Sequence, residues 1–168
     1  DAVIARWGRD PHALVQILRE TQAQTHWLSR ELLAHIGVEL GLTRAHVEGV
    51  ASFYRFFHTQ PVGRVRVLFS NNITDRMLGS NALLERLCQR LGVEPGQVDA
   101  QGRLSVDRCS CTGLCDQGPA LLINHHQVIT RLDETRIDQL AECLLAGVPV
   151  EDWPAEWFRV EEQVRRAD

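Results

Sequence analysis

The sequence contains no lysine, no long apolar run and no evenly spaced set of cysteines, and the last two absences each argue against a class of protein. All 18 basic residues are arginine, they are spread along the chain, and the net charge is −4, which excludes a nucleic-acid-binding patch. No apolar run approaches the roughly 20 residues of a membrane span, and the N-terminus lacks signal-peptide features. An odd, bunched set of five cysteines argues against a secreted disulfide scaffold. We therefore expect a cytoplasmic protein with no nucleic-acid partner and no direct membrane contact.

Residues 1–60 have the periodicity of short amphipathic helices. Asp10-Pro11 is typical of a helix start, and Ser29 and Thr43 can each cap a further helix. Gly41 can end the second helix. Three apolar faces follow, with residues spaced by three and four: Leu14, Ile17 and Leu18; Leu32, Leu33, Ile36 and Leu40; Val47, Val50, Ala51 and Tyr54. The pattern predicts a small helical bundle.

Residues 61–147 change to alternating strand and helix patterns. Strands are expected at residues 64–69, 103–106, 120–123 and 127–130, with a polar loop from Ser70 to Asp75. Asn81 and Asp133 are expected to cap helices over residues 81–91 and 133–146. The order β-α-β-β-β-α predicts an α+β domain of thioredoxin size, in which helices pack on a small sheet.

Residues 148–168 have a different composition, with prolines, acidic residues and the aromatic residues Trp153, Trp157 and Phe158. They predict a linker and docking tail that leaves the domain and packs on another surface. The chain begins without Met and ends without a recognisable signal. We therefore expect a piece of a longer protein that continues beyond Asp168.

The most informative stretch is residues 109–119, which hold Cys109, Cys111 and Cys115. Gly113 and Gly118 allow tight bends there. Thiolates on such a loop between strands suit a soft metal centre. Spacing alone leaves Cys111 and Cys115 equally open as ligands or free thiols. Cys109 is an extra thiolate that could replace a ligand, complete a structural zinc site or pair oxidatively with a neighbouring cysteine, or it has no role.

The other candidate groups point to no chemistry in this chain. Cys88 lies on the apolar face of its predicted helix, which indicates a core residue, and Cys143 is assigned no role. The histidines are expected at surfaces, caps and a hairpin tip, although a zinc site with His125 or His126 is conceivable. No nucleotide-binding motif and no Ser/His/Asp arrangement occurs. We expect no catalytic residue and no cofactor-binding motif.

Two segments, however, resemble one known family. The helix Gly49-Val50-Ala51-Ser52-Phe53-Tyr54 and the loop Cys111-Thr112-Gly113-Leu114-Cys115-Asp116, followed by Pro119-Ala120, carry the resemblance. They are similar to segments of the 24 kDa subunit of the NADH dehydrogenase module of respiratory complex I, and the similarity covers almost the whole chain. It implies an N-terminal helical bundle followed by a thioredoxin-like ferredoxin domain.

In that family a [2Fe–2S] cluster is held by a Cys-x4-Cys pair after the first strand and a Cys-x3-Cys pair in a later loop. The second pair corresponds to Cys111 and Cys115, but the first falls on Ser70 and Asp75. Because thiolates are the preferred ligands of such clusters, the resemblance implies a degenerate site that binds no stable cluster. The alternative is an electron-transfer protein in which Ser70, Asp75 or Cys109 completes the ligand set.

The loop after residue 69 and the C-terminal tail look most like the N-terminal domain of the flavin-bearing diaphorase subunit of soluble NAD-reducing [NiFe]-hydrogenases. This resemblance implies a scaffolding domain that packs on an FMN- and NAD(H)-binding partner subunit or adjoining domain. Iron–sulfur and hydrogenase subunits, or those of a formate dehydrogenase, would complete the assembly. Hydride transfer would then belong to the partner's flavin.

Overall fold

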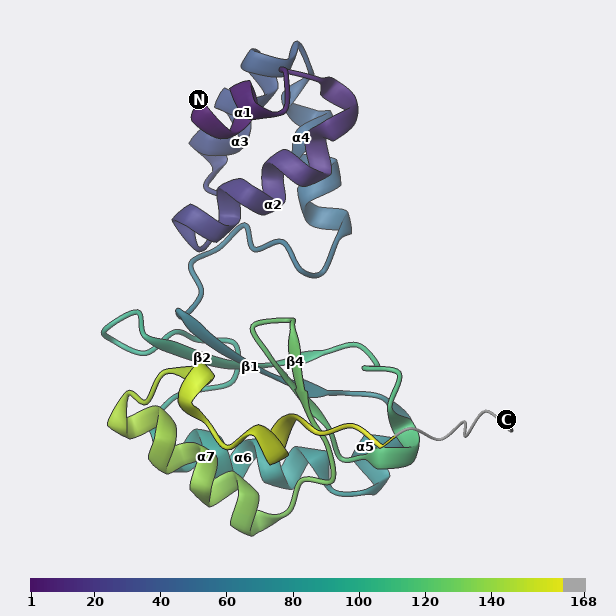
Figure 1. Cartoon of the computed structure of the whole chain (residues 1–168), viewed down its shortest axis with the longest axis vertical. Helices are drawn as coiled ribbons and strands as arrows, with labels where there is room; N and C mark the ends of the chain where they lie inside the picture. The colour runs from purple at the N-terminus through teal and green to yellow at the C-terminus, as the bar shows by residue number, and fades with distance from the viewer. Residues whose placement is uncertain (162–168) are drawn as a thin grey trace. The chain divides into compact units, whose positions relative to one another are not determined.

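The computed structural model describes residues 1–161, so the last seven residues of the predicted tail lie outside it. The chain forms two compact units, one spanning Asp1–Val62 and one that begins at Gly63 (Figure 1). Across residues 1–161, no helix has both the length and the apolar character needed to cross a membrane.

The first unit is a small helical bundle with its own core. Its elements are α1 (Ala2–Arg6), the 3-10 turn η1 (Pro11–Ala13), α2 (Leu14–Thr25), α3 (Arg30–Leu40) and α4 (Arg44–Phe53). Ser29 and Thr43 cap α3 and α4, because their hydroxyl oxygens accept backbone N–H groups of the first turn. The unpredicted α1 contributes Val3 and Ile4 to the core, whereas Tyr54 terminates α4 instead of extending its buried face.

The second unit is built on a four-stranded mixed sheet with the strand order β2-β1-β3-β4. The strands are β1 (Val65–Ser70), β2 (Leu104–Cys109), β3 (Leu121–Ile123) and β4 (Gln127–Ile129). β1 runs parallel to β2 and antiparallel to β3, which is antiparallel to β4. The predicted α+β class with a thioredoxin-like domain is confirmed.

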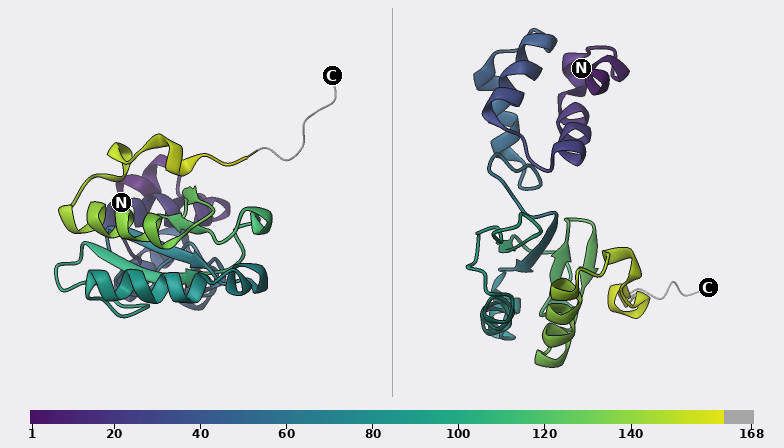
Figure 2. Two further views of the ribbon diagram at one scale, coloured as in Figure 1. Left: turned by 90° about the horizontal axis from the view of Figure 1, so that it is seen from below. Right: turned by 90° about the vertical axis from the view of Figure 1, so that its left-hand side faces the viewer.

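Helices of the second unit gather beside the sheet. The helix α6 (Ser80–Leu91) lies side by side with α7 (Glu134–Ala146) on one face of the sheet (Figure 2). Their apolar faces pack against Val67, Phe69 and the other inward-facing strand residues. Asp133 caps α7 as predicted, but α6 begins after the left-handed Gly79 without a cap from Asn81. The predicted polar loop after β1 contains a further short helix, α5 (Ile73–Met77).

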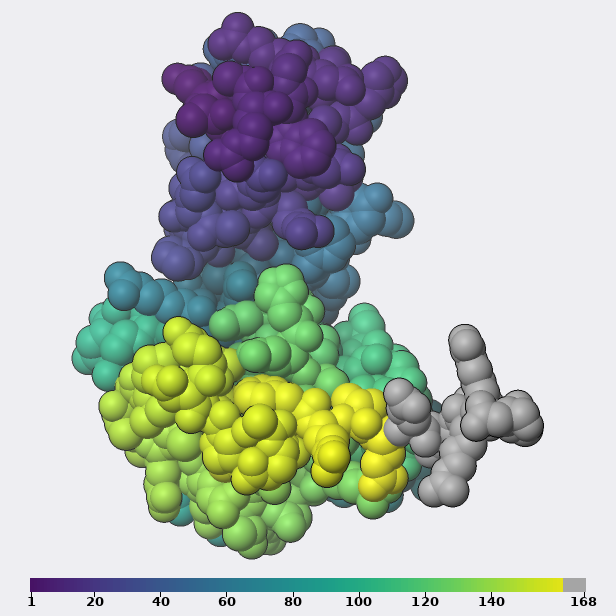
Figure 3. Space-filling model, viewed as in Figure 1, coloured from purple at the N-terminus to yellow at the C-terminus, as the bar shows by residue number. Residues whose placement is uncertain are grey.

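The segment after α7 belongs to the core of the second unit. It forms two 3-10 turns, η3 (Val150–Asp152) and η4 (Ala155–Phe158), and lies against the rest of the unit (Figure 3). Val150, Trp153 and Trp157 are buried in the same core as the sheet and helices. The prediction of a tail that leaves the domain is therefore wrong for residues 148–161. Its aromatic side chains cover apolar surface of their own unit.

Candidate functional site

The candidate site lies where β1 and β2 end, at the same edge of the sheet because the two strands are parallel. Ser70 at the end of β1 is in register with Cys109 at the end of β2. At the end of β1, Ser70 N–H donates to the Ala120 carbonyl at 3.0 Å. Just after it, Asn71 N–H donates to the Cys109 carbonyl at 3.1 Å. These bonds bring the loop after β1 beside the cysteine loop, residues 110–120, which joins β2 to β3.

Cys111 and Cys115 lie together on the cysteine loop, with their Sγ atoms 3.2 Å apart. Gly113, whose φ of 82° suits glycine, donates its N–H to Cys111 Sγ at 3.3 Å. This hydrogen bond, followed by the one from Cys115, lowers the pKa of the exposed Cys111 thiol. The same sulfur contact raises the pKa of Cys115. The two thiols are therefore inequivalent, and the anionic form is favoured at Cys111 relative to Cys115.

Ser70 and Asp75, at the predicted positions of the other two ligands, are buried at 1% and 0% exposure. Both are bonded to the side chain of Asn72. Asn72 Nδ2 donates to Ser70 Oγ at 2.9 Å, to Asp75 Oδ2, and to Cys111 Sγ at 3.6 Å. The structure thus brings together three of the four predicted ligand positions, but around an amide nitrogen.

Asn72 also supports this arrangement through the oxygen of its side-chain amide. Its Oδ1 accepts the N–H of Asp75 at 2.9 Å, which caps α5. The second oxygen of Asp75 accepts the N–H of Ala120 at 3.1 Å. Sequence reasoning missed Asn72, although an Asn followed three residues later by an acidic side chain is a helix-start signal.

Gln117 and Gly118, which follow Cys115, tie the loop to its surroundings. Sequence reasoning also missed both of them. A Cβ on Gly118 would lie 2.3 Å from Asp75 Oδ1, so only glycine lets the carboxylate approach. The buried Gln117 amide forms two 3.0 Å hydrogen bonds with the backbone of Glu161. Arg131 adds an ion pair to the Glu161 carboxylate at 2.6 Å. The C-terminal segment therefore holds the base of the cysteine loop.

The remaining candidate ligand, Cys109, points elsewhere, because its Sγ lies 3.6 Å from the Leu68 carbonyl oxygen. Within residues 1–161, a mutually close group of three metal-ligating side chains occurs only at the exposed Asp1 and His35 and the half-buried Glu39. The geometry therefore assembles neither a three-thiol zinc site nor Asp75 with Cys111 and Cys115. Two of the four predicted ligand positions supply oxygen atoms that are already hydrogen-bonded, where a [2Fe–2S] cluster prefers thiolates.

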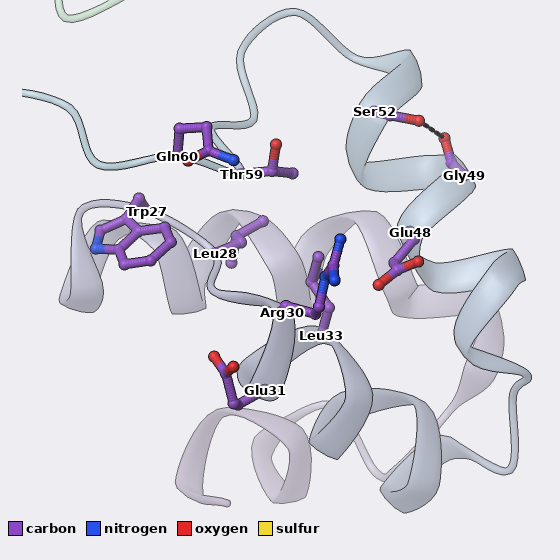
Figure 4. Close-up of a pocket in the computed structure, with 10 residues that line it drawn as sticks. All are labelled: Trp27, Leu28, Arg30, Glu31, Leu33, Glu48, Gly49, Ser52, Thr59 and Gln60. Atoms are coloured by element: carbon purple, nitrogen blue, oxygen red, sulfur yellow. Dashed lines mark hydrogen bonds between the residues drawn. The ribbon is translucent and has the colours of Figure 1, made fainter. Parts of the chain in front are cut away.

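A separate hollow of about 540 Å³ lies within the first unit (Figure 4). Its charged side chains are Arg30, Glu31 and Glu48, and Glu48 is paired with Arg44. Ser52 donates to the Gly49 carbonyl at 3.0 Å. The residues that line it, all of them in the described part of the chain, include neither His nor Cys.

The fold and the cysteine loop define a class: a thioredoxin-like α+β domain, preceded by a helical unit, with two neighbouring thiols on the loop between β2 and β3. The family model of the thioredoxin-like [2Fe–2S] ferredoxins matches residues 1–145, and the chain belongs to that family.

Named relatives come from two kinds of enzyme. The chain is 29% identical over 140 residues to NADH-quinone oxidoreductase subunit 2 of Thermus thermophilus, covering 83% of this chain and 77% of that protein. It is 30% identical over 145 residues to the NAD-reducing hydrogenase HoxS subunit alpha of Cupriavidus necator, covering 86% of this chain and 24% of that subunit. A crystal structure of an NAD⁺-reducing [NiFe]-hydrogenase matches with a TM-score of 0.79 and 37% identity, over 89% of this chain and 25% of that one. The chain thus spans about a quarter of these two hydrogenase chains.

Proposed function

We propose that this chain is an architectural and docking domain of an NAD(H)-dependent oxidoreductase assembly of the NAD-reducing hydrogenase kind, and that it holds no stable [2Fe–2S] cluster. Family membership and the named relatives support a place in a multi-subunit electron-transfer assembly. Its partners would be a flavin- and NAD-binding diaphorase subunit or adjoining domain, with iron–sulfur and hydrogenase (or formate dehydrogenase) subunits. FMN, NAD and the working clusters would reside on those partners, in the cytoplasm.

The observation that carries the proposal is the position of the Asn72 side chain. Its amide nitrogen is hydrogen-bonded to the side chains at three of the four ligand positions, Ser70, Asp75 and Cys111. Iron bound at Ser70 and Asp75 would have to replace these hydrogen bonds with oxygen ligation. Thiolate is the preferred cluster ligand. Oxygen ligation by both Ser70 and Asp75 would therefore place two unfavourable ligands on the same iron. The architecture of the site is then kept by hydrogen bonds in place of metal.

Exposed apolar side chains support the docking role. On and next to α5, beside the cysteine loop, Ile73, Met77 and Leu78 are 69%, 81% and 51% exposed. In the first unit, Val38 and Phe53 are each 78% exposed. Clustered apolar groups on a surface mark sites of interaction with other proteins. We assign the α5 surface to the flavin-bearing partner, because it adjoins the remnant of the electron-transfer site.

One observation favours a second candidate, an electron-transfer domain that binds a [2Fe–2S] cluster. Cys111 and Cys115 remain side by side and exposed or half-buried, with Gly113 N–H directed at one sulfur. Two such thiolates could ligate one iron, with Ser70 and Asp75 on the other after displacement of Asn72. Cys109 would have to leave the Leu68 carbonyl to take part.

Iron, sulfide and zinc analysis of the anaerobically purified chain, together with its visible spectrum, tests the proposal. We expect folded, colourless protein with neither metal in stoichiometric amount. Iron and sulfide near two atoms per chain, with sulfide-to-iron charge-transfer bands, would instead establish the electron-transfer candidate. Stoichiometric zinc without iron would establish the structural zinc site.

A variant that restores the missing thiolates is the positive control. Ser70→Cys combined with Asp75→Cys supplies four cysteines at the four ligand positions. After anaerobic reconstitution with iron and sulfide we expect it to gain [2Fe–2S] absorption, because its neighbours Cys111 and Cys115 are already in place. The matched Ser70→Ala, Asp75→Ala variant should stay colourless. Equal cluster loading in the wild-type chain would contradict the claim that Ser70 and Asp75 are the defect.

A further inference from the structure

The two sulfur atoms of the cysteine loop are closer than ordinary non-bonded neighbours need to be, and no second thiolate pair stands opposite them. Cys111 Sγ and Cys115 Sγ are 3.2 Å apart, whereas the facing positions hold the buried oxygen side chains of Ser70 and Asp75. We infer that Cys111 and Cys115 form a reversible dithiol–disulfide site that exchanges with a small disulfide molecule. The inference rests on the proposed function, since thiolates bound to iron would not be available.

The loop geometry permits the bond. A disulfide has an S–S distance of about 2.05 Å, so the sulfurs need to approach each other by only about 1 Å. The three residues between the cysteines include Gly113, which already adopts a backbone conformation that suits glycine. The bond would close residues 111–115, which lie between β2 and β3 in the chain.

The surroundings distinguish the roles of the two thiols. Cys111 is exposed and its sulfur accepts hydrogen bonds from Gly113 N–H and Asn72 Nδ2. Its exposure lets a small disulfide reach this sulfur. Cys115 is half-buried, and its Sγ lies 3.2 Å from Cys111 Sγ. Cys111 is therefore the attacking thiol, and Cys115 resolves the intermediate.

The exchange balances in two steps. Cys111 Sγ, as the thiolate, attacks one sulfur of the small disulfide; that S–S bond breaks, and one small thiolate leaves with the bonding pair. Cys115 Sγ then gives up its proton and attacks the Cys111 sulfur of the mixed disulfide, which releases the second small thiolate. The chain is oxidised by two electrons and the small disulfide is reduced to two thiols. One of these thiols takes the proton of Cys115, and the other takes from the solvent the proton that Cys111 gave up when it became a thiolate.

The other cysteines provide internal controls. Cys88 is buried in the core of the second unit, and Cys143 lies half-buried on α7. Neither offers an exposed sulfur with directed donors. Oxidation is thus expected to involve Cys111 and Cys115 and to spare Cys88 and Cys143.

The experiment incubates the full, metal-analysed chain with mixtures of reduced and oxidised glutathione and then maps the thiols by alkylation and peptide mass. We expect Cys111 and Cys115 to be lost together as one intramolecular disulfide that dithiothreitol reverses, while Cys88 and Cys143 stay alkylatable. Cys115→Ser should accumulate glutathione on Cys111. Cys111→Ser should lower the rate of glutathione-dependent oxidation on the order of tenfold, and Cys143→Ser should leave it unchanged.

The outcomes separate this inference from the proposed function. Iron-free protein in which Cys111 and Cys115 stay reduced across the whole series overturns the dithiol site and leaves the docking domain standing. Iron-free protein in which Cys111 pairs with Cys109 also overturns it. Stoichiometric iron and sulfide, with both thiols protected from alkylation, overturns both proposals. Circular dichroism of each variant shows that a lost reaction is not lost folding.

Discussion

At the scale of single residues, Asn72 determines how the site is built. One side chain caps α5, satisfies the buried Ser70 hydroxyl and binds the buried Asp75 carboxylate. In a site with four cysteines these groups would be thiolates held by metal. Hydrogen bonds here supply the cross-link between the loop after β1 and the cysteine loop. The stability of this edge of the sheet should therefore depend on an amide.

Asn72→Ala is expected to destabilise the second unit by about 2 kcal/mol or more, because it removes a helix cap and leaves buried polar groups short of a partner. Urea dependence of Cys88 alkylation reports on this unit alone, since that thiol is buried in its core. The neighbouring Asn71→Ala, at an exposed side chain, should change stability by no more than about 0.5 kcal/mol. Equal effects of the two variants would show that the Asn72 network carries no stability.

The residues of the site were predictable to the extent that they depend on spacing. Spacing placed Cys111 and Cys115 together, and the family pattern placed Ser70 and Asp75 opposite them. The central role of Asn72 could not be derived, because its bond to Cys111 joins residues 39 positions apart. The same holds for Gln117, whose partner Glu161 is 44 positions away. Local patterns carry no information about such pairs.

At the scale of elements, α6 and α7 are joined by a charged cluster as well as by apolar packing. Arg86 on α6 donates to both oxygens of Asp138 on α7, at 2.9 and 2.8 Å, and Arg90 lies 3.2 Å from the same carboxylate. The hydrogen bonds from Arg86 lower the pKa of Asp138. These ion pairs thus join α6 to α7 where the two helices meet at the surface.

The direction of that pKa shift predicts a pH dependence. A carboxyl whose pKa is lower in the folded chain stabilises it above the unfolded pKa of about 3.9 and loses this effect as pH falls through the folded value. Asp138→Asn should therefore be less stable than the wild type at neutral pH, with a difference that shrinks below about pH 4. Thermal unfolding across pH measures it. Glu142→Gln, at an exposed carboxylate 3.8 Å from Arg90, is the control and should show no such pattern.

The segment after α7 is the second element whose role is open to a direct test. Trp157 is 7% exposed, packs against Trp153, and has the Arg136 guanidinium 4.8 Å from its ring centroid. Trp157→Ala should cost about 3–5 kcal/mol, as truncation of a buried aromatic residue does. Val160→Ala, two residues past η4, should change stability by about 0.5 kcal/mol or less. A small loss of stability in Trp157→Ala, measured by Cys88 alkylation in urea, would show that this segment is a tail and not part of the core.

Elements were predictable wherever a local signal exists. Ser29, Thr43 and Asp133 are caps because side-chain oxygens bond to backbone N–H groups only three residues on. The five-residue α5 was missed, since it is too short to show an apolar period. The C-terminal segment was misjudged for a different reason. Its tryptophans pack on residues of the sheet and helices that are distant in sequence, which composition alone does not reveal.

At the scale of the whole molecule, each unit has a core of its own. The change from helical to strand periodicity was predicted at residue 61, and the compact units divide between Val62 and Gly63. Gly63 belongs to the second unit for two reasons. Its N–H donates to Ser105 Oγ at 3.3 Å, and a Cβ there would lie 2.2 Å from the Leu104 carbonyl carbon. A fragment that begins at Gly63 therefore keeps the contacts of this glycine with Leu104 and Ser105 at the start of β2.

The division predicts a contrast between two fragments. Residues 63–168 should fold alone, with cooperative unfolding and slow amide exchange in β1, because they contain the complete core of the second unit. Residues 63–147 lack Val150, Trp153 and Trp157, so apolar surface on α7 and the sheet is exposed and cooperativity should be reduced or lost. Hydrogen exchange of both fragments, with the full chain as reference, measures the contrast. Equal protection in the two would show that the segment after α7 is dispensable for folding, and a longer fragment that fails to fold would show that the second unit requires the helical unit.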